Sequence, residues 1–504
     1  MTSLLAQLLP VPFEAPTIDA LALGPEIVLS VLFVVLLLLD SIKLERARAL
    51  MPAVANIGFL LALVPLLALA ADGGVRIMFG GSYVVDSMAL ILKAMFIVSA
   101  YVVVLLSTNY MAEGDYWESE YYTLMVCSVL GMVVMASSRD LIGIFVALEL
   151  LSIPAYMLAG WRKGDAGSNE AGMKYYLMGV FASAVLLYGM SLIYGVGGST
   201  RLEDIAVRLA EIGDKGVPVV TLAILFTIIG FAFKVSAVPF HSWAPDTYEG
   251  APTPVTAFLA VASKAAGFVA LINIVYFCFI VRADIIQPVF FVLAVLSMTV
   301  GNLIALRQTN VVRMLAYSGI AQAGFMLAPF VVADELPVAS RQAVVVYLVI
   351  YAAMNLGAFA VVIAVARKTR SAEIDSFGGL FSYMPGMAVA LTLFLASLIG
   401  IPPLGGWYAK FGVFSVLIEA QTTLGLITAL IMAVNTAIAA YYYLKVARAM
   451  WFEDAPDGDI APVRVPTALT AAVVLALVAT LVFGVLPGLL TNVTEYGPLA
   501  LGAH

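Results

Sequence analysis

Charged residues are scarce in this sequence. Only 11% of the 504 residues are Asp, Glu, Lys or Arg, whereas 63% are hydrophobic. Soluble domains contain about 25% charged and about 45–50% apolar residues, so this composition excludes a soluble globular protein and predicts a chain that crosses a membrane many times. The formal net charge of -7 is small for this length and indicates no nucleic-acid partner.

Cysteine is nearly absent as well, with two residues in the whole chain. Cys127 and Cys278 lie in separate apolar runs, so the sequence lacks a disulfide framework and a cysteine cluster that could hold zinc or an iron–sulfur centre. We expect both thiols to be buried and inert. The chain also contains no convincing GxGxxG or Walker motif, so we expect no redox or nucleotide cofactor in this chain.

Long apolar runs are what the sequence has in abundance. A membrane-crossing helix needs about 20 mainly apolar residues, and we count about 14 such runs, separated mostly by short connections. The first residues, MTSLLAQLLPVPFEAP, have no basic n-region and contain Glu14, so we expect no cleaved signal peptide. The sequence therefore predicts an all-α polytopic membrane protein without a soluble domain.

Basic residues favour one set of alternate loops. That set includes Arg46, Arg162 and Arg367. Loops rich in Lys and Arg remain in the cytoplasm, so we expect this side to be cytoplasmic. An even number of spans then places both termini on the opposite side.

Several ionisable residues lie inside the apolar runs, and they are the candidate functional residues: Lys93, Glu149, Lys174, Lys234, Lys264, Arg313 and Lys410. A charge at the bilayer centre costs about 2.5–3.5 kcal/mol on insertion scales, so it is usually functional or paired. With a rise of about 1.5 Å per residue, Glu149, Lys264 and Lys410 lie near the midplane. The alternative for these residues and Lys234 is a fixed buried ion pair.

The other polar and aromatic candidates can each have a structural role instead of a functional one. Lys93 and Lys174 lie close to acidic helix starts and can snorkel to the interface, and Arg313 can anchor a helix end. His241, which follows Pro239, either links water to the interior or caps a broken helix. Trp243 and Trp407 are expected to be packing or interface residues.

Two spans contain helix breakers next to a lysine. The seventh is interrupted at KVSAVP and the twelfth at LIGIPPLGGWYAK. Unpaired backbone cannot face lipid, so both breaks must be buried in protein or line a wet cavity. Lysine precedes the prolines in one span and follows them in the other, which predicts two inverted five-helix repeats, spans 4–8 and 9–13. We expect the boundaries 1–110, 118–280, 286–450 and 464–504.

Four segments resemble the antiporter-like membrane subunits of respiratory complex I. They are FKVSAVPFHSWAPDTYEGAPTPVTAFLAVASKAAGF from Phe233, ALELLSIPAYML around Glu149, GNLIALRQTNVVRMLAYSGIAQAGFML around Arg313, and LIGIPPLGGWYAKF around Lys410. Among these subunits the N type is similar in having a lysine rather than an acid in the twelfth span and no long C-terminal lateral helix. Gln322 departs from relatives that have a histidine there.

The resemblance implies a function. The chain is expected to be a proton-translocating membrane-arm subunit of NADH:quinone oxidoreductase in a bacterial inner membrane, with both termini periplasmic. Glu149, Lys234, Lys264 and Lys410 are expected to carry protons, with Lys174 and His241 secondary. The resemblance also implies FMN, iron–sulfur clusters, NADH and quinone in partner subunits, and neighbouring subunits K and M.

Other functions remain open on the sequence. A subunit of a multisubunit sodium/proton antiporter or of a membrane hydrogenase shares the glutamate and lysine pattern. A purely structural arm component, in which the lysines do nothing, is the third alternative. Copurification with flavin and iron–sulfur subunits distinguishes these possibilities.

Overall fold

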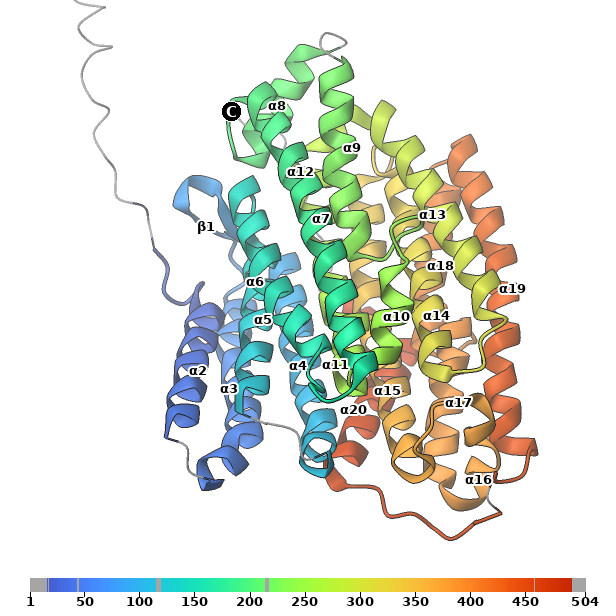
Figure 1. The fold of residues 1–504 in the computed structure, drawn as a ribbon. Coiled ribbons are helices and arrows are strands. Elements are labelled where there is room, and N and C mark those ends of the chain that lie inside the picture. The colour runs from blue at the N-terminus through green and yellow to red at the C-terminus, as the bar shows by residue number, and fades with distance from the viewer. Residues whose placement is uncertain are drawn as a thin grey trace, which may run out of the picture.

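The structure is a computed structural model that describes residues 16, 18–42, 45–114, 119–213, 217–456 and 458–491. The N-terminal segment considered for a signal peptide and the C-terminal end lie outside the described residues, apart from residue 16. The described chain forms a bundle of roughly parallel and antiparallel helices (Figure 1). Helices α2 and α3 lie at one edge of the bundle and α19 at the other (Figure 1).

Twelve helical segments of the described chain are long and apolar enough to cross a membrane. They are α2 (Gly24–Ser41), α3 (Glu45–Asp72), α4 (Ser87–Glu113), α5 (Ser119–Ser137), α6 (Leu141–Ala159), α7 (Ala166–Gly197), the segment of α11 (Thr253–Phe258), η2 (Leu259–Ser263) and α12 (Lys264–Phe277), the segment of η3 (Phe279–Arg282) and α13 (Ala283–Ala305), the segment of α14 (Val311–Leu327) and η4 (Ala328–Val332), α15 (Pro337–Thr369), α19 (Thr423–Phe452) and α20 (Thr467–Val485). The predicted all-α membrane class is confirmed, whereas the number of fourteen spans remains a prediction.

Two shorter apolar helices end inside the bundle. Helix α9 (Val217–Lys234) is followed by a turn and then by α10 (Trp243–Gly250), and α17 (Pro385–Ile399) is followed by α18 (Gly405–Glu419). The interruptions coincide with the proline and glycine positions noted in the sequence, because proline cannot donate a backbone hydrogen bond inside a helix. The two predicted breaks are therefore present.

Two connections between the long helices contain regular structure that the sequence did not predict. Strands β1 (Arg76–Met78) and β2 (Tyr83–Val85) form an antiparallel hairpin around η1 (Phe79–Gly81). Helix α8 (Leu202–Ile212) packs through four buried apolar residues, Leu202, Ile205, Ala206 and Leu209. Their spacing is typical of an amphipathic helix. Shorter elements complete the described chain: η5 (Ile374–Phe377), α16 (Leu380–Tyr383) and α21 (Gly488–Thr491).

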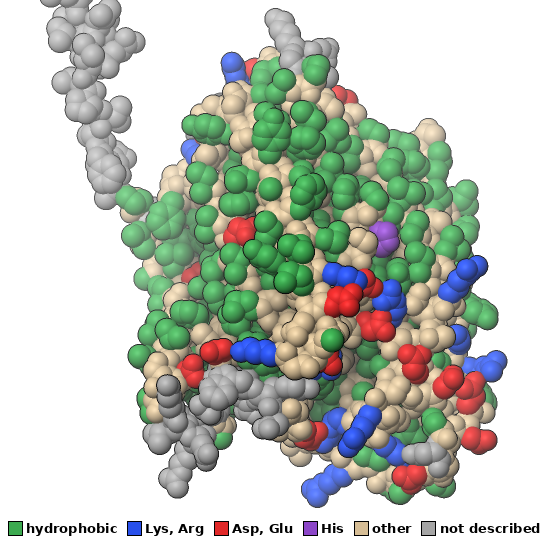
Figure 2. Space-filling view, viewed as in Figure 1, with side chains coloured by type: hydrophobic (Ala, Val, Ile, Leu, Met, Phe, Trp, Pro, Cys, Tyr) green, Lys and Arg blue, Asp and Glu red, His purple; other side chains and the backbone are tan. Residues whose placement is uncertain are grey.

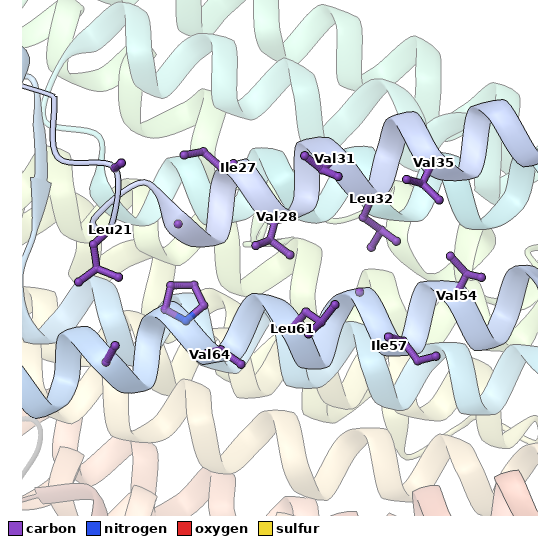
Figure 3. Close-up of a pocket in the computed structure, with 15 residues that line it drawn as sticks. Leu21, Ile27, Val28, Val31, Leu32, Val35, Val54, Ile57, Leu61 and Val64 are labelled. Atoms are coloured by element: carbon purple, nitrogen blue, oxygen red, sulfur yellow. The ribbon is translucent and has the colours of Figure 1, made fainter.

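The bundle has a buried centre and a lipid-like periphery. The segment from Thr253 to Phe277 is buried between its two end residues, whereas α2 is only 28% buried. Helices α2 and α3 enclose an apolar groove of about 710 Å³ that opens to the outside (Figure 3). Cys278 is buried and Cys127 is half-buried, and both thiols are free. The expectation of burial is thus met fully by Cys278 and in part by Cys127.

Candidate functional site

Lys264 lies at the centre of the bundle, directly after a single π-helical turn. The turn, η2, wraps Leu259–Ser263 and leads into α12, whose first residue is Lys264. Single π turns inside α-helices occur frequently at functional sites. The side chain is 2% exposed, and its Nζ donates a hydrogen bond of 2.9 Å to the carbonyl oxygen of Gly319 on α14. A Cβ atom at Gly319 would lie 3.0 Å from this nitrogen, so glycine leaves the space that the ammonium group needs.

Lys234 ends the first broken helix. It is the last residue of α9, and its Nζ donates hydrogen bonds to Ser152 Oγ at 2.8 Å and to Tyr175 Oη at 3.1 Å. The side chain is 3% exposed. Trp243 stacks on Tyr175, with ring centroids 4.4 Å apart, and donates through Nε1 to the carbonyl of Phe233. The last carbonyls of α9 are therefore satisfied by backbone N–H groups of the following turn, such as Ala237 N to Ala232 O at 2.8 Å, with Trp243 as an additional donor.

Glu149 does not contact Lys234 directly. Its Oε1 accepts a hydrogen bond of 2.6 Å from Ser183 Oγ on α7, and no ion pair joins it to a basic group of the described chain. A fixed Glu149–Lys234 ion pair, one alternative from the sequence, is therefore not the arrangement found. Glu149 is half-buried, and its helix neighbours Val146 and Ile153 are more than half exposed on the outside of the bundle.

Lys410 belongs to the second broken helix and reaches back across the break. It lies on α18, is 4% exposed, and donates through Nζ to the carbonyl of Ile399, the last residue of α17, at 2.8 Å. Gly400 has a φ of 98°, a conformation that favours glycine. The ring of Phe325 lies 4.6 Å from the nitrogen and gives the cation a second favourable contact.

A buried polar network lies between Lys264 and Lys410. Gln322 on α14 accepts from Tyr347 Oη at 2.5 Å and donates to the carbonyl of Leu398 at 3.1 Å. Its amide also lies 3.4 Å from Tyr443 Oη, which forms a hydrogen bond with Ser318. Ser318 precedes Gly319, the partner of Lys264, and Leu398 precedes Ile399, the partner of Lys410. Neutral polar groups therefore connect the surroundings of the two lysines.

Buried hydroxyl groups without protein partners surround the first break. Ser236 Oγ, Thr247 Oγ1 and Tyr248 Oη are buried and form no hydrogen bond with the described chain. The ring of Tyr248 lies 6.0 Å from Lys264 Nζ. Buried polar groups normally bind protein or ordered water. The Tyr248 hydroxyl is therefore suited to bind water near Lys264.

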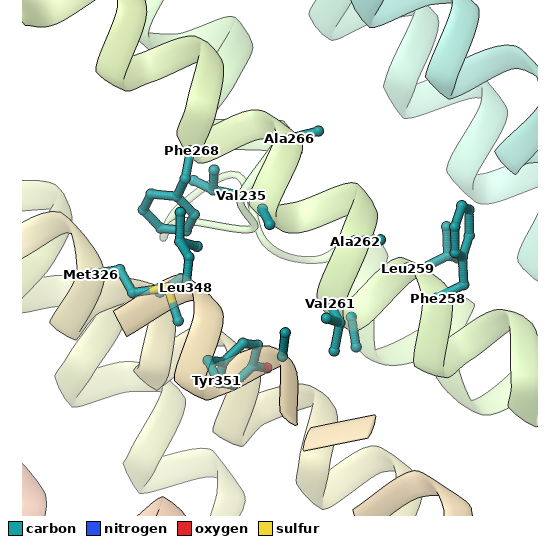
Figure 4. Close-up of a cluster of buried hydrophobic side chains, with 14 of the residues drawn as sticks. Val235, Phe258, Leu259, Val261, Ala262, Ala266, Phe268, Met326, Leu348 and Tyr351 are labelled. Atoms are coloured by element: carbon teal, nitrogen blue, oxygen red, sulfur yellow. The ribbon is translucent and has the colours of Figure 1, made fainter. Parts of the chain in front are cut away.

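Apolar side chains flank this polar set. Figure 4 shows Phe268, Met326 and Leu348 pointing toward one another from three helices, with Val235 next to Phe268. All four are buried. Close packing of this kind leaves little room for water among these four side chains.

Lys174, one of the two secondary candidates, lies apart from the buried lysines. Its side chain is 42% exposed and pairs with Glu170 and Asp246, both at 2.7 Å. Arg313 pairs with Asp246 at 3.0 Å and with Glu249 at 2.6 Å. These groups line a polar pocket of about 430 Å³. Figure 2 shows charged side chains gathered in the lower half of the face, below a broad hydrophobic region.

His241, the other secondary candidate, is half-buried in the break between α9 and α10. Its Nδ1 is buried and forms no hydrogen bond with the described chain. Nδ1 of His241 therefore does not cap a helix end, which was one of the two roles expected for this residue. Trp243 is a packing residue as expected, and Trp407 stacks on Phe411 with centroids 5.3 Å apart.

The snorkelling interpretation of Lys93 is wrong. Lys93 has no exposed surface and forms an ion pair of 2.7 Å with Glu26 on α2. Sequence reasoning missed Glu26 because it stands at a helix start, where an acidic residue is ordinary. The fold turns this helix start inward, and the carboxylate becomes the partner of the lysine.

Sequence reasoning also missed the neutral members of the site: Ser152, Tyr175, Ser183, Gly319, Tyr347 and Tyr443. Charge identified the lysines, but hydroxyl groups in apolar runs are common and carry no comparable signal. Repeated tyrosines on one helix, as in YYYLKV from Tyr441, were the available indication. Only the contacts between helices distinguish Tyr443, which is buried, from Tyr441, which is 65% exposed.

The arrangement suits proton transfer. Lys234, Lys264 and Lys410 lie inside the bundle, and each donates only to hydroxyl or carbonyl oxygens, with no carboxylate within ion-pair distance in the described chain. The described residues include no group of three or more His, Cys, Asp or Glu side chains that could hold a metal ion. The amines, the carboxylate and the hydroxyl groups of the site can bind and release protons.

Comparisons with known proteins agree with this chemistry. Residues 138–436 match the family described as NADH:quinone oxidoreductase/Mrp antiporter, TM. The NADH-quinone oxidoreductase subunit N of Trichlorobacter lovleyi is 38% identical over 482 residues, which cover 95% of this chain and 97% of the relative. Among solved structures, a chain of respiratory complex I from Thermus thermophilus with bound aureothin is 33% identical, with a TM-score of 0.76, and 94% of this chain and all of that chain are covered.

A more distant similarity concerns the fold alone. A chain of the Mrp complex from Dietzia is 20% identical, with a TM-score of 0.82, and the match covers 95% of this chain and 97% of that chain. This likeness shows the shared helical arrangement alone.

Proposed function

This chain belongs to the NADH:quinone oxidoreductase/Mrp antiporter family of membrane subunits, and from this premise we propose that it moves protons through the membrane arm of an NADH:quinone oxidoreductase. Its relatives over nearly the full length are named as subunit N of that enzyme. The chain is then one part of a proton-translocating enzyme whose redox chemistry takes place elsewhere. FMN, iron–sulfur clusters, NADH and quinone are bound by partner subunits.

One observation carries the proposal. Lys234, Lys264 and Lys410 are each at most 4% exposed, and their hydrogen-bond acceptors are all neutral. A buried charge without an opposite charge is unfavourable by several kcal/mol. Amines in such surroundings can lose and regain a proton. A permanently charged group at the same position would destabilise the folded protein.

Each residue has a distinct part in the proposed path. Glu149 exchanges a proton with the neighbouring subunit, and Lys234 receives it through Ser152 and bound water. Lys264 and Lys410 carry it farther along the midplane, with the Gln322 network between them. Lys174 and His241 have a secondary part, on the side where protons enter.

The two broken helices support an internal inverted repeat. Lys234 precedes its break, whereas Lys410 follows its break and reaches back to α17. We propose that 118–280 and 286–450 are two five-helix units of opposite orientation, between the N-terminal segment 1–110 and the C-terminal segment 464–504. Broken helices that meet at a repeat interface are a recurring design for membrane transport.

The surroundings of Glu149 point to a protein neighbour. Val146 and Ile153 are 56% and 53% exposed around this half-buried acid. A carboxylate that faced lipid would be costly, so a partner subunit covers this face. We propose that the chain lies between subunits K and M, and that one of them meets Glu149.

The cytoplasmic side is proposed to be the one that carries the loop around Arg162. Both termini then lie on the periplasmic side of the inner membrane. Cysteines placed at Lys163 and at Glu203, both exposed, should react with an impermeant reagent from opposite sides. Labelling of both from one side would contradict this topology.

Lys264→Ala tests the proposed function directly. In membranes with matched complex content, proton uptake per NADH oxidised should fall, because the amine is removed from the path. Lys445→Ala, which alters an exposed lysine at the end of α19, is the control and should behave as wild type. Proton uptake that continues in sodium-free buffer distinguishes this function from sodium/proton antiport. Wild-type uptake by Lys264→Ala would overturn the proposal.

A further inference from the structure

A second buried ionisable cluster lies outside the path described above. It consists of Glu26, Tyr83 and Lys93, which we call the hairpin triad because Tyr83 belongs to strand β2. Lys93 Nζ lies 2.7 Å from Glu26 Oε1 and 3.3 Å from Tyr83 Oη. Tyr83 Oη donates to the same glutamate oxygen, and Lys93 lies 5.1 Å from the Tyr83 ring centroid.

The triad has one unused proton-binding position. Glu26 is 8% exposed, and its Oε2 is buried without a hydrogen-bond partner in the described chain. Burying an unpaired polar oxygen costs free energy. An ion pair with a purely structural role would not be stabilised by the unpaired Oε2 of Glu26. A proton-binding site, in contrast, can accept and release a proton at this atom.

The triad lies near the hairpin end of the bundle. Glu26 is the third residue of α2, and Lys93 is in the second turn of α4. The side chains of Ala22, Met78 and Val85 form a small apolar cluster with Tyr83. Figure 1 places β1 toward the end where α8 lies, away from α16. Under the proposed topology this is the periplasmic end.

Further charges link the triad to the central helix. Asp86, about two turns before Lys93 on α4, pairs with Arg139 at 3.2 Å. Arg139 donates to Asn273 Oδ1 at 2.9 Å on α12, the helix that begins with Lys264. Glu26, Asp86 and Arg139 are the charged groups whose field acts on Lys93. The triad is thus connected with the helix that carries the central lysine.

We propose that the hairpin triad is a second proton-binding site, which receives protons from the midplane lysines and releases them on the periplasmic side. This inference rests on the proposed function. A proton passes from Lys93 Nζ to Glu26, leaving a neutral amine and a neutral acid. Glu26 then releases a proton from Oε2 to water, and Lys93 regains one from the interior. One proton enters, one leaves, and the triad returns to its first state.

A structural role predicts a different response to neutralisation. Replacing both members of a buried ion pair by neutral residues is often tolerated, whereas removing one leaves an unpaired charge. The double variant Glu26→Gln/Lys93→Met therefore separates the two roles. We expect it to assemble but to translocate fewer protons per NADH oxidised. The exchanged variant Glu26→Lys/Lys93→Glu keeps two titratable groups and should recover part of the lost transport.

Two controls complete the experiment. Arg282→Gln/Asp284→Asn removes another ion pair, of 2.8 Å, and should keep the wild-type proton ratio. Lys264→Ala is measured in the same membranes. If Lys264→Ala is impaired and the triad double variant has the wild-type ratio, the triad proposal alone is overturned. If Lys264→Ala has the wild-type ratio, the proposed function itself fails.

If the double variant does not assemble, a second variant still tests the proposal. Tyr83→Phe removes one hydroxyl group and keeps the Glu26–Lys93 pair, so it is the second variant. We expect a smaller loss of proton transport and a shifted pH profile of that transport, because Glu26 loses a donor that stabilises its charged form. A wild-type ratio together with an unchanged pH profile in Tyr83→Phe would overturn the triad proposal.

Discussion

Lys410 Nζ donates to the carbonyl of Ile399 across the break between α17 and α18, at 2.8 Å. The acceptor is the last residue of a helix that ends inside the protein. A helix C-terminus carries partial negative charge and is stabilised by a nearby cation. The protonation of Lys410 is therefore coupled to the stability of the helix end that it caps.

Lys410→Glu should impair proton transport strongly, although glutamate can also bind and release a proton. Related subunits resemble this chain but have an acid in the twelfth span, which predicts a mild effect. An ionised glutamate, however, cannot donate to Ile399 and would face the negative end of α17. We expect Lys410→Glu to lower proton transport at least as strongly as Lys410→Ala, measured as proton uptake per NADH in membranes of matched complex content. Near-normal transport by Lys410→Glu would show that the cap is unimportant.

Lys234 and Glu149 should differ in which replacement they tolerate. Glu149→Asp keeps a titratable acid and should retain substantial transport. Lys234→Arg keeps the charge but is effectively always protonated, so transport should be lost even with assembly intact. Energy-coupled quinone reduction and proton uptake provide the measurement. Wild-type pumping by Lys234→Arg would favour a fixed structural cation.

Gly267→Ala should hinder Lys234 without changing any charge. A Cβ atom at Gly267 would lie 3.0 Å from Lys234 Cγ and 3.0 Å from Val235 Cγ1, so the lysine stem must move. We expect slower proton uptake with normal complex content. Gly412→Ala is the matched control, since nothing lies within 4 Å of its new Cβ, and alanine favours the helix by about 1 kcal/mol. Equal rates in both variants would mean that the position of the Lys234 stem is not limiting.

Gln322→Leu should interrupt the network between Lys264 and Lys410. It removes the acceptor of Tyr347 and the donor to Leu398, and leaving such buried groups unpaired costs about 1–3 kcal/mol. We expect a lower midpoint of thermal unfolding and reduced proton transport. Gln322→His can donate and accept and should retain transport. Transport that is equally poor in both variants would point to a packing defect instead of a broken network.

Asp459 gives a pH-dependent contact outside the membrane spans. The backbone N–H of Ala461 and the Lys368 ammonium hold the pKa of Asp459 below its usual value. A depressed pKa contributes stability above the unfolded pKa, and this is lost as pH falls through the folded pKa. Lys368→Gln raises that pKa, so protease cleavage near Asp459 should begin to increase at a higher pH than in wild type. An unchanged cleavage profile would exclude a role for Lys368 in fastening this segment.

Charge in an apolar context made part of the site predictable. Lys234, Lys264 and Lys410 were identified because a lysine in a membrane span needs an explanation, and the helix breakers located both interruptions. Lys93 shows the limit of this reasoning, since distance from a helix start does not reveal whether the side chain points to water or to another helix. Its partner Glu26 is 67 residues away in the sequence, and no local pattern encodes that contact.

The neutral members of the path were beyond sequence reasoning for another reason. A tyrosine or serine in an apolar run has the same local pattern whether it faces lipid or a lysine, and only the packing of helices determines which. Helix α8 was different, because its apolar residues recur with helical spacing and could have been recognised. The β hairpin has three-residue strands, too short for any alternation to be visible.

The π-helical turn before Lys264 changes the angle at which the residues of α12 are displayed relative to those of α11. An α-helix turns by about 100° per residue, and a π turn accommodates one residue more than the regular ladder. If the same residues formed a regular α-helix instead, Lys264 would be rotated by about 100° relative to α11. Such a change would keep every ionisable group in the chain and alter only the angular alignment of the lysine. The placement of Lys264 therefore depends on the pitch of one helical turn as well as on its charge.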